Sequence, residues 1–346
     1  MDKFLKKSWF EVKSFAKELF DKDPMRIRPY LSYANQHKIH IKGRVLEDEG
    51  IIEMEENSTL DNLIKNLKSF ASDEAKFAKV IITYQEQIIE TYTDDDGYFE
   101  VELDIEQEPK DGEFLEWDSA HIMTPNFKNE KGETIENTIG ILMPHRDTEH
   151  VIVSDIDDTV LVTNVNSFLK LKMLYNTLFK NVHTRMPFED ISEVLHTLSL
   201  NKEGKKVNPI FYLSNSPWNL YDMLHNFLKL ENIPMGPLFL RDFGLKFGDE
   251  LKAFRNHKMN TLEHLLEFYK EQNFILIGDA TESDTDIYLE LFTKYSNRID
   301  HIYIRGDKAK KNARVLEMIE KHPEAPIHLI EHSSDILKFQ EKKHTH

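Results

Sequence analysis

The second half of the chain alternates short, uniformly apolar runs with longer stretches in which apolar residues recur every three to four positions. The runs predict strands buried on both faces, as in a parallel sheet covered by helices on each side. The longer stretches predict amphipathic helices, and the alternation is typical of an α/β domain. The predicted strands lie at 150–154, 209–214, 238–240, 274–278 and 301–305, and the predicted helices at about 165–181, 188–200, 217–230, 258–271, 284–295 and 308–321.

The region from about 38 to 145 instead alternates single apolar and polar residues, which predicts strands with one buried face. We therefore expect a β-rich, sandwich-like domain over 25–147, followed by an α/β domain over 148–340. Between two of its strands, the run from Asp94 to Gly97 could be a calcium loop or a tight turn. We favour the turn, because the register lacks a glutamate at the twelfth loop position. The predicted strands lie at 38–45, 79–84, 88–92, 98–105 and 139–143.

The first 24 residues place most of their apolar side chains on one broad helical face that is bordered by lysines. They predict an amphipathic helix over 1–24. Such a helix either packs on its own domain or lies on a membrane surface. We favour packing, because most apolar stripes on helices are buried in this way.

Composition and charge narrow the classes of function. Of the 346 residues, 40% are hydrophobic and 11% aromatic, which is typical of a globular protein and argues against disorder. The absence of cysteine excludes disulfides, thiolate nucleophiles and cysteine-based zinc sites. A formal net charge of -17 argues against nucleic acid as a partner, since its phosphates are bound mainly by clustered lysine and arginine. An anionic substrate would need local positive charge, for which a divalent cation is the obvious source.

Targeting signals are not apparent in the sequence. No run approaches the roughly 20 apolar residues of a transmembrane helix. The start of the chain also lacks the unbroken apolar core of a signal peptide. We expect a cytoplasmic protein without a transmembrane segment, for which peripheral contact with a membrane remains open.

Acidic and hydroxyl residues stand at the ends of three predicted strands. Asp155 follows the first strand, Ser214 ends the second and Asp279 follows the fourth. Because ligands of parallel sheets bind at the carboxyl ends of the strands, we expect these side chains to converge. Converging acids need a counter-ion, and Mg²⁺ prefers one or two carboxylates together with substrate phosphate oxygens. The sequence therefore predicts a Mg²⁺ site that includes Asp155 and Asp279.

Four residues have predicted roles in phosphoryl transfer. Asp155 is the candidate nucleophile, because a carboxylate partly neutralised by metal can attack phosphorus and form an aspartyl-phosphate. Asp157, on the same side of an extended segment, could protonate the leaving alkoxide and then deprotonate the attacking water. Ser214 can hydrogen-bond a phosphoryl oxygen. Lys258, which opens the predicted helix 258–271, can offset the charge of the phosphoryl group and the acids.

The order of these residues resembles that of a known set of motifs. It is similar to the four ordered motifs of haloacid dehalogenase-type phosphotransferases, and more narrowly to the catalytic domain of the actin-patch-associated phosphatidate phosphatase family and its bacterial relatives, which are distant relatives of lipins. A weaker resemblance covers that family's β-rich amino-terminal region. The motif residues are Asp155, Asp157, Thr159, Ser214, Lys258, Gly278, Asp279 and Asp284, the narrower match lies in 211–218, 240–242 and 277–288, and the weaker one in 28–35, 42–46 and 97–99.

The resemblance implies a Rossmann-like parallel sheet of haloacid dehalogenase type and hydrolysis of phosphatidate to diacylglycerol and phosphate with Mg²⁺. It also implies that Asp157 and Asp284 lie beside the metal. Whether Asp284 contacts the metal or only supports the site stays open, because 280–282 replaces a loop that more commonly contains glycine. Finally, it implies that Thr159 and Asn215, with the serine and lysine of the motifs, bind the substrate.

The stretches of sequence between the motifs are largely taken up by predicted helices of the core, and they are too short to hold a large cap domain over the site as well. A capless site would be open, and so suited to a headgroup presented by a membrane. We therefore expect a phospholipid substrate at a membrane surface. Two alternatives remain, namely the same chemistry on a soluble phosphomonoester or phosphoprotein, and a non-catalytic binding or scaffold protein. The intact set of Asp155, Asp157, Lys258 and Asp279 argues against the scaffold.

Overall fold

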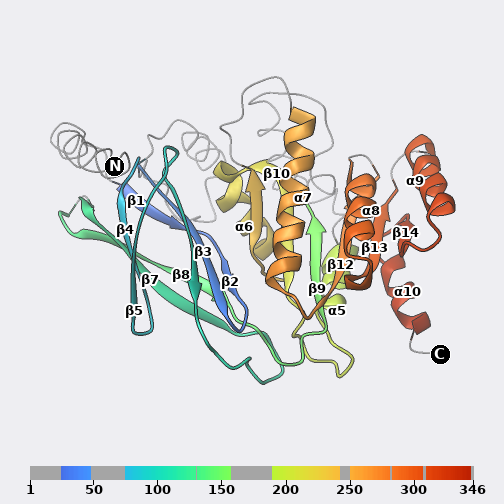
Figure 1. Cartoon of the computed structure of the whole chain (residues 1–346), viewed down its shortest axis with the longest axis horizontal. Coiled ribbons are helices and arrows are strands. Elements are labelled where there is room, and N and C mark those ends of the chain that lie inside the picture. The colour runs from blue at the N-terminus through green and yellow to red at the C-terminus, as the bar shows by residue number, and fades with distance from the viewer. Residues whose placement is uncertain are drawn as a thin grey trace. The chain divides into compact units, whose positions relative to one another are not determined.

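The computed structural model describes residues 25–47, 75–129, 131–156, 189–241, 250–280, 283–306 and 309–343. These residues fall into two compact units, each with one sheet (Figure 1). The first unit takes the described residues of Met1–Glu108 and Trp117–Met143, and the second takes those of Pro109–Glu116 and Pro144–His346. The predicted amphipathic helix over 1–24 lies outside the described residues and stays a prediction.

The first unit is β-rich, as predicted. Its sheet has the order β1-β3-β2-β8-β7-β4-β5, with β6 paired to β3. All of these pairs are antiparallel except β2 with β8, which run parallel. The strands are β1 (Met25–Pro29), β2 (Ser32–Ala34), β3 (Lys38–Glu47), β4 (Lys79–Tyr84), β5 (Gln87–Tyr92), β6 (Tyr98–Asp104), β7 (Trp117–Lys128) and β8 (Thr134–Leu142).

Strands of this unit could be predicted from the sequence where apolar and polar residues clearly alternate. In β4, for example, every second side chain is buried, and the buried ones join the core of the unit. The alternation correctly predicted β3, β4, β5, β6 and β8, although β8 begins earlier than expected. It missed β1, β2 and β7, because β1 and β7 mix polar and apolar residues and β2 has only three residues.

The acidic segment between β5 and β6 forms a turn, as predicted. One carboxylate oxygen of Asp94 accepts hydrogen bonds from the backbone N–H groups of Asp96 and Tyr98. Gly97 takes a φ of 78°, which glycine adopts without the steric penalty of a side chain. The turn does not close a hairpin between its flanking strands, however, because β6 pairs with β3.

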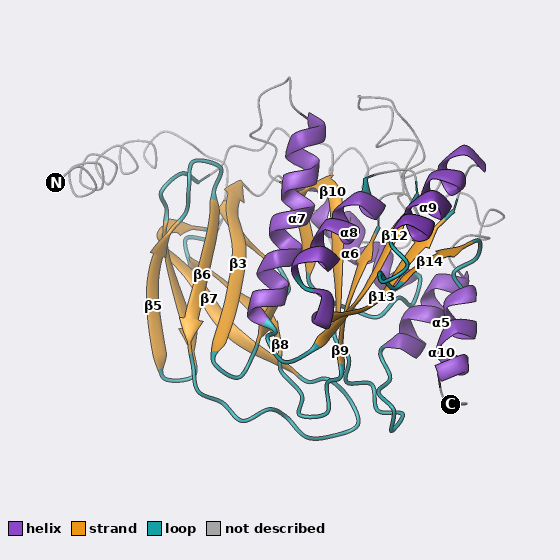
Figure 2. Ribbon diagram, turned by 45° about the vertical axis from the view of Figure 1, so that its right-hand side comes forward, coloured by secondary structure: helices purple, strands orange, loops and turns teal. Residues whose placement is uncertain are grey.

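The second unit contains a parallel sheet of six strands in the order β11-β10-β9-β12-β13-β14. Its central strands are buried on both faces, which explains their uniformly apolar sequences. In Figure 2, α7 lies beside α8, and α5 lies beside α10. The strands are β9 (His150–Asp155), β10 (Ile210–Pro217), β11 (Leu238–Arg241), β12 (Asn273–Asp279), β13 (Ile299–Arg305) and β14 (Ile327–Ile330), and the helices are α5 (Glu189–Leu198), α6 (Tyr221–Leu230), α7 (Glu250–Phe268), α8 (Asp284–Lys294), α9 (Ala309–Lys321) and α10 (Asp335–Lys343), with short 3-10 helices at Trp218–Leu220 and Ser296–Arg298.

The strand order explains where a ligand would bind. The chain adds β10 and β11 on one side of β9, and then β12, β13 and β14 on the other. Open parallel sheets bind ligands where the order reverses in this way, at the carboxyl ends of the strands. Asp155 ends β9 and Asp279 ends β12, so both lie at this point. The predicted mixed α/β architecture, with a parallel sheet and a separate β-rich unit, is confirmed.

Two differences from the predicted elements concern the second unit. The sequence did not predict β14 and α10, which are short and form the last elements of the chain that are described. Helix α7 begins at Glu250, not at 258, because residues 250–257 are mostly polar and lack an apolar period. The predicted helix at 165–181 lies outside the described residues. Among the described helices, none is long and apolar enough to cross a membrane.

Candidate active site

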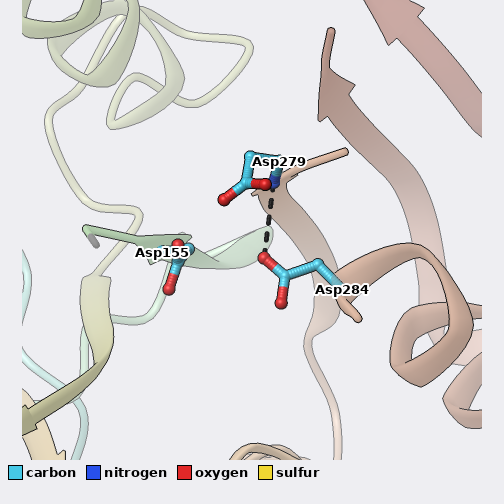
Figure 3. Close-up of side chains that lie close together, drawn as sticks. All are labelled: Asp155, Asp279 and Asp284. Atoms are coloured by element: carbon cyan, nitrogen blue, oxygen red, sulfur yellow. Dashed lines mark hydrogen bonds between the residues drawn. The ribbon is translucent and has the colours of Figure 1, made fainter. Parts of the chain in front are cut away.

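Three aspartates converge at the carboxyl ends of the central strands of the second unit (Figure 3). Asp155 comes from the end of β9, Asp279 from the end of β12, and Asp284 from the first turn of α8. One carboxylate oxygen from each lies within 4.8 Å of the others, and all three side chains are buried. Two unit charges 4 Å apart repel by about 4 kcal/mol at an effective dielectric constant of about 20, so the cluster requires positive charge.

Lys258 supplies part of this charge. Its side chain is only 1% exposed, and its Nζ lies 2.9 Å from Asp155 Oδ1 and 2.7 Å from Asp284 Oδ1. A buried ammonium is costly unless it is paired, and here two carboxylates pair with it. Because α7 begins at Glu250, Lys258 lies inside this helix and does not open it, which corrects the prediction from sequence. Its predicted role, to offset the charge of a phosphoryl group, stays a prediction.

Asp284 is held by the protein through both of its carboxylate oxygens. Oδ1 accepts from Lys258, and Oδ2 accepts from the backbone N–H of Asp279 at 3.3 Å, drawn as the dashed line in Figure 3. Its place in the first turn of α8 also suits a negative charge, because the helix dipole is positive at that end. These contacts tie the helix to the end of β12.

Gly278 and Tyr288 allow this close approach, and sequence reasoning did not assign either a role. A Cβ at Gly278 would lie 2.5 Å from Asp284 Oδ2 and 2.9 Å from the Tyr288 ring, so only glycine fits. The Tyr288 phenol donates to the Ile277 carbonyl at 3.2 Å. Burial, and the charge of Asp284, hold the pKa of this phenol well above its ordinary value, so it stays a donor. The i, i+4 spacing from Asp284 was the available signal for Tyr288.

Ser214 and Asn215 stand near the end of β10, the neighbour of β9. Ser214 is fully buried, and its Oγ accepts from the Ser216 N–H at 3.0 Å, so the backbone holds the hydroxyl in place. The register between β10 and β11 shifts between Leu213 and Pro217, which marks an irregular strand end at these residues. Their predicted contacts with substrate stay predictions.

Two further predicted site residues, Asp157 and Thr159, lie outside the described residues, as do Thr281 and Glu282 of the fourth motif's loop. Their roles therefore stay predictions.

The described donor set fits a divalent cation such as Mg²⁺. Carboxylate oxygens are the hard ligands that this ion prefers. The three aspartates carry three negative charges and Lys258 one positive charge, so the four described groups leave a formal charge of -3 + 1 = -2. Asp155 and Asp279 would hold the ion, whereas Asp284 already accepts hydrogen bonds at both oxygens.

Comparisons with known proteins point to one family. Residues 150–306 match the family described as "Phosphatidate phosphatase APP1, catalytic domain". Over 155 residues the chain is 28% identical to phosphatidate phosphatase APP1 of Saccharomyces cerevisiae, covering 44% of this chain and 25% of that protein. It is also 30% identical over 156 residues to an uncharacterized protein of Schizosaccharomyces pombe, covering 44% and 24%. The match thus spans about a quarter of either relative.

Solved structures add no argument about the fold. A Bacteroides uniformis β-glucuronidase aligns with 88% of this chain and 39% of its own, but with 11% identity and a TM-score of only 0.27. The matched family segment, in contrast, contains the aspartate cluster, Lys258 and Ser214. Residues 150–306 are therefore similar to the catalytic domain of the APP1-like phosphatidate phosphatase family, and this similarity supports a phosphatase.

Proposed function

We propose that the protein is a Mg²⁺-dependent phosphatase of haloacid dehalogenase type that hydrolyses phosphatidate to diacylglycerol and phosphate. The observation that carries the proposal is the buried cluster of Asp155, Asp279, Asp284 and Lys258 at the strand ends, within the segment that matches the family. The relative in Saccharomyces cerevisiae is named a phosphatidate phosphatase, which supports the choice of substrate.

The proposed reaction has two steps that both use Asp155. In the first, a carboxylate oxygen of Asp155 attacks phosphorus, the bond from phosphorus to the ester oxygen breaks, and the leaving alkoxide takes a proton from Asp157. In the second, Asp157 removes a proton from water, the water oxygen attacks phosphorus, and the aspartyl bond breaks to release phosphate. Asp155 ends the reaction as the carboxylate with which it began.

The described residues support these steps by position and charge. Lys258 keeps Asp155 in one orientation through a 2.9 Å contact, and the backbone of β9 fixes its Cα at the strand end. A cation bound by Asp155 and Asp279 would neutralise charge on the phosphoryl oxygens. Burial of the acids strengthens each of these interactions, because the effective dielectric constant falls away from water.

The substrate would be met at a membrane surface, to which the protein attaches peripherally. The same chemistry on a soluble phosphomonoester or phosphoprotein is the alternative, and the substrate screen below separates the two. A purely binding or scaffold role is disfavoured, because the proposed nucleophile Asp155 lies close to Asp279, Asp284 and Lys258.

The nucleophile is tested by Asp155→Asn. The variant keeps the shape of the side chain but loses the charge, so we expect Mg²⁺-dependent phosphate release to fall by at least about a thousandfold. Asp300→Asn is the matched control, because Asp300 lies near the amino end of β13 and contacts His150 and Asn273. Circular dichroism and urea unfolding would establish that both variants fold. If folded Asp155→Asn kept most of its activity, the covalent mechanism would be wrong.

The substrate class is tested on the wild-type protein. Phosphate release would be measured from phosphatidate in mixed micelles and vesicles and from p-nitrophenyl phosphate, each with and without Mg²⁺. We expect turnover of phosphatidate that requires the cation. Turnover of soluble esters alone would favour the alternative substrate class, and no turnover of any ester would favour the scaffold.

A further inference from the structure

Lys258, the lysine of the site, already forms ion pairs with two aspartates of the protein. The Lys258 ammonium donates to Asp284 Oδ1 at 2.7 Å and forms an ion pair with Asp155 Oδ1 at 2.9 Å. The described groups of the site sum to a formal charge of -2, and a phosphomonoester adds up to two more negative charges. One divalent cation cannot balance both sets. A further positive group near the strand ends would therefore favour substrate binding.

Arg305 lies where such a group is needed. It is the last residue of β13, and the parallel register pairs it with Asp279 at the end of β12, its neighbour in Figure 1. Residues in register on adjacent strands project to the same face of a sheet, so the Arg305 side chain leaves the sheet on the side of the Asp279 carboxylate. The Ala280 N–H donates to the Arg305 carbonyl at 2.9 Å, which fixes the backbone beside the acid cluster.

Arg305 is partly buried as a residue and, within the part of the chain that the structure describes, its guanidinium forms neither a hydrogen bond nor an ion pair. Two other described arginines of this unit already have acidic partners: Arg255 pairs with Glu290, and Arg314 pairs with both oxygens of Asp286. Arginine carries five N–H donors in a planar fork that matches two oxygens of a phosphate. An arginine at the strand ends that has no partner among the described residues is suited to a bound anion.

We propose that Arg305 binds the phosphomonoester dianion of the substrate, by donating to its phosphoryl oxygens, and so determines substrate affinity. The inference rests on the proposed function, which it extends by a residue from the end of β13. Inorganic phosphate, the product, presents the same anion and binds the same guanidinium. Lys258 orients the nucleophile, whereas Arg305 captures the anion.

The test compares Arg305→Gln and Arg305→Lys with a matched control, Arg314→Gln. The control removes the same charge from an arginine that Asp286 already neutralises. On phosphatidate micelles with Mg²⁺, we expect Arg305→Gln to raise KM about tenfold, in line with the loss of a charge-assisted hydrogen bond, and to change kcat less than threefold. Arg305→Lys should recover part of the affinity, and the control should match the wild type.

Binding is measured separately from turnover. Calorimetric titration of the Mg²⁺-loaded protein with inorganic phosphate should show weaker binding for Arg305→Gln by a similar factor, and a parallel titration with phosphatidate vesicles tests the lipid headgroup. Weakening with vesicles alone would overturn the phosphate contact and assign Arg305 to the lipid surface. An unchanged KM and unchanged phosphate binding would overturn the proposal outright. If the wild type hydrolyses no ester, the proposed function fails, whereas phosphate binding still tests Arg305.

Discussion

At the scale of single residues, Gly278 shows how little space separates the acids of the site. The residue stands in β12 directly before Asp279, and Asp284 and Tyr288 pack against it from α8. Asp284 reaches the backbone of β12 only because no side chain intervenes. The glycine of the fourth motif is therefore explained by a steric requirement, in addition to its resemblance to a family pattern.

Gly278→Ala is predicted to disturb both stability and activity. The added methyl group would meet Asp284 at 2.5 Å, and overpacking of this kind costs about 1–3 kcal/mol. Because a misplacement of about 1 Å can lower a rate a hundredfold, we expect phosphatase activity to fall at least about tenfold. Urea unfolding and phosphate release would measure the two effects. Gly140→Ala is the control, since its nearest atoms lie at 3.4 and 3.6 Å. A fully active and stable Gly278→Ala would contradict the steric argument.

At the scale of elements, the antiparallel pair of β3 and β6 carries a row of interacting side chains on one face, which we call the Glu100 ladder. Glu100 accepts from His40 at 2.8 Å and pairs with Lys42 at 3.0 Å, and the His40 ring stacks on Tyr33. The hydrogen bond from His40, and then the charge of Lys42, lower the pKa of Glu100 to about 2. Cross-strand pairs of this kind stabilise a sheet, and here one acid connects two residues of the neighbouring strand.

The sign of the pH effect follows from this lowered pKa. Glu100 is ionised in the folded protein down to about pH 2, whereas its ordinary pKa is 4.5. Its contribution to stability is therefore fully present above about pH 5 and is lost as the pH falls towards 2. We expect Glu100→Gln to destabilise the protein at pH 6, and the gap from wild type to shrink at pH 3.5 in urea unfolding.

The control for this prediction is Glu136→Gln. Glu136 also faces a histidine, His121, at 3.0 Å, but that histidine is 44% exposed while His40 is 7% exposed. Surface pairs of this kind contribute little, so the control should show a smaller gap at pH 6. Equal gaps for both variants at every pH would contradict the role given to the Glu100 ladder.

At the scale of the whole molecule, a formal net charge of -17 attracts cations in general to the protein surface. General screening by salt acts on this total charge, whereas a bound divalent ion acts only where the aspartates converge. The two effects can therefore be separated by comparing ions at equal ionic strength.

We predict that Mg²⁺ stabilises the wild-type protein beyond NaCl of equal ionic strength. At a hundred times its dissociation constant, a ligand of the folded state adds about 2.7 kcal/mol, which corresponds to a rise in Tm of roughly 5–10 °C. Differential scanning calorimetry would measure the difference, which Asp279→Asn should abolish because Asp279 is one of the two expected ligands. Equal stabilisation by both salts in the wild type would contradict a specific cation site.

The order of residues along the chain was enough to predict five of the six described strands and several helices of the α/β unit, and to place Asp155 and Asp279 at strand ends. These features are local, because the period of apolar residues and the residue after a strand can be read along the chain. It could not determine that α7 begins at Glu250, since polar residues there carry no apolar period.

The assembly of the site depends on contacts that the tertiary structure brings together. Lys258 and Asp284 are 26 residues apart, yet their side chains meet at 2.7 Å because α7 and α8 pack side by side. The steric need for Gly278 and the place of Arg305 beside Asp279 likewise depend on neighbours that are distant in sequence. Local periodicity fixes which segments are strands and helices, but packing and strand register fix which side chains share a site, because these depend on contacts between segments far apart in the chain.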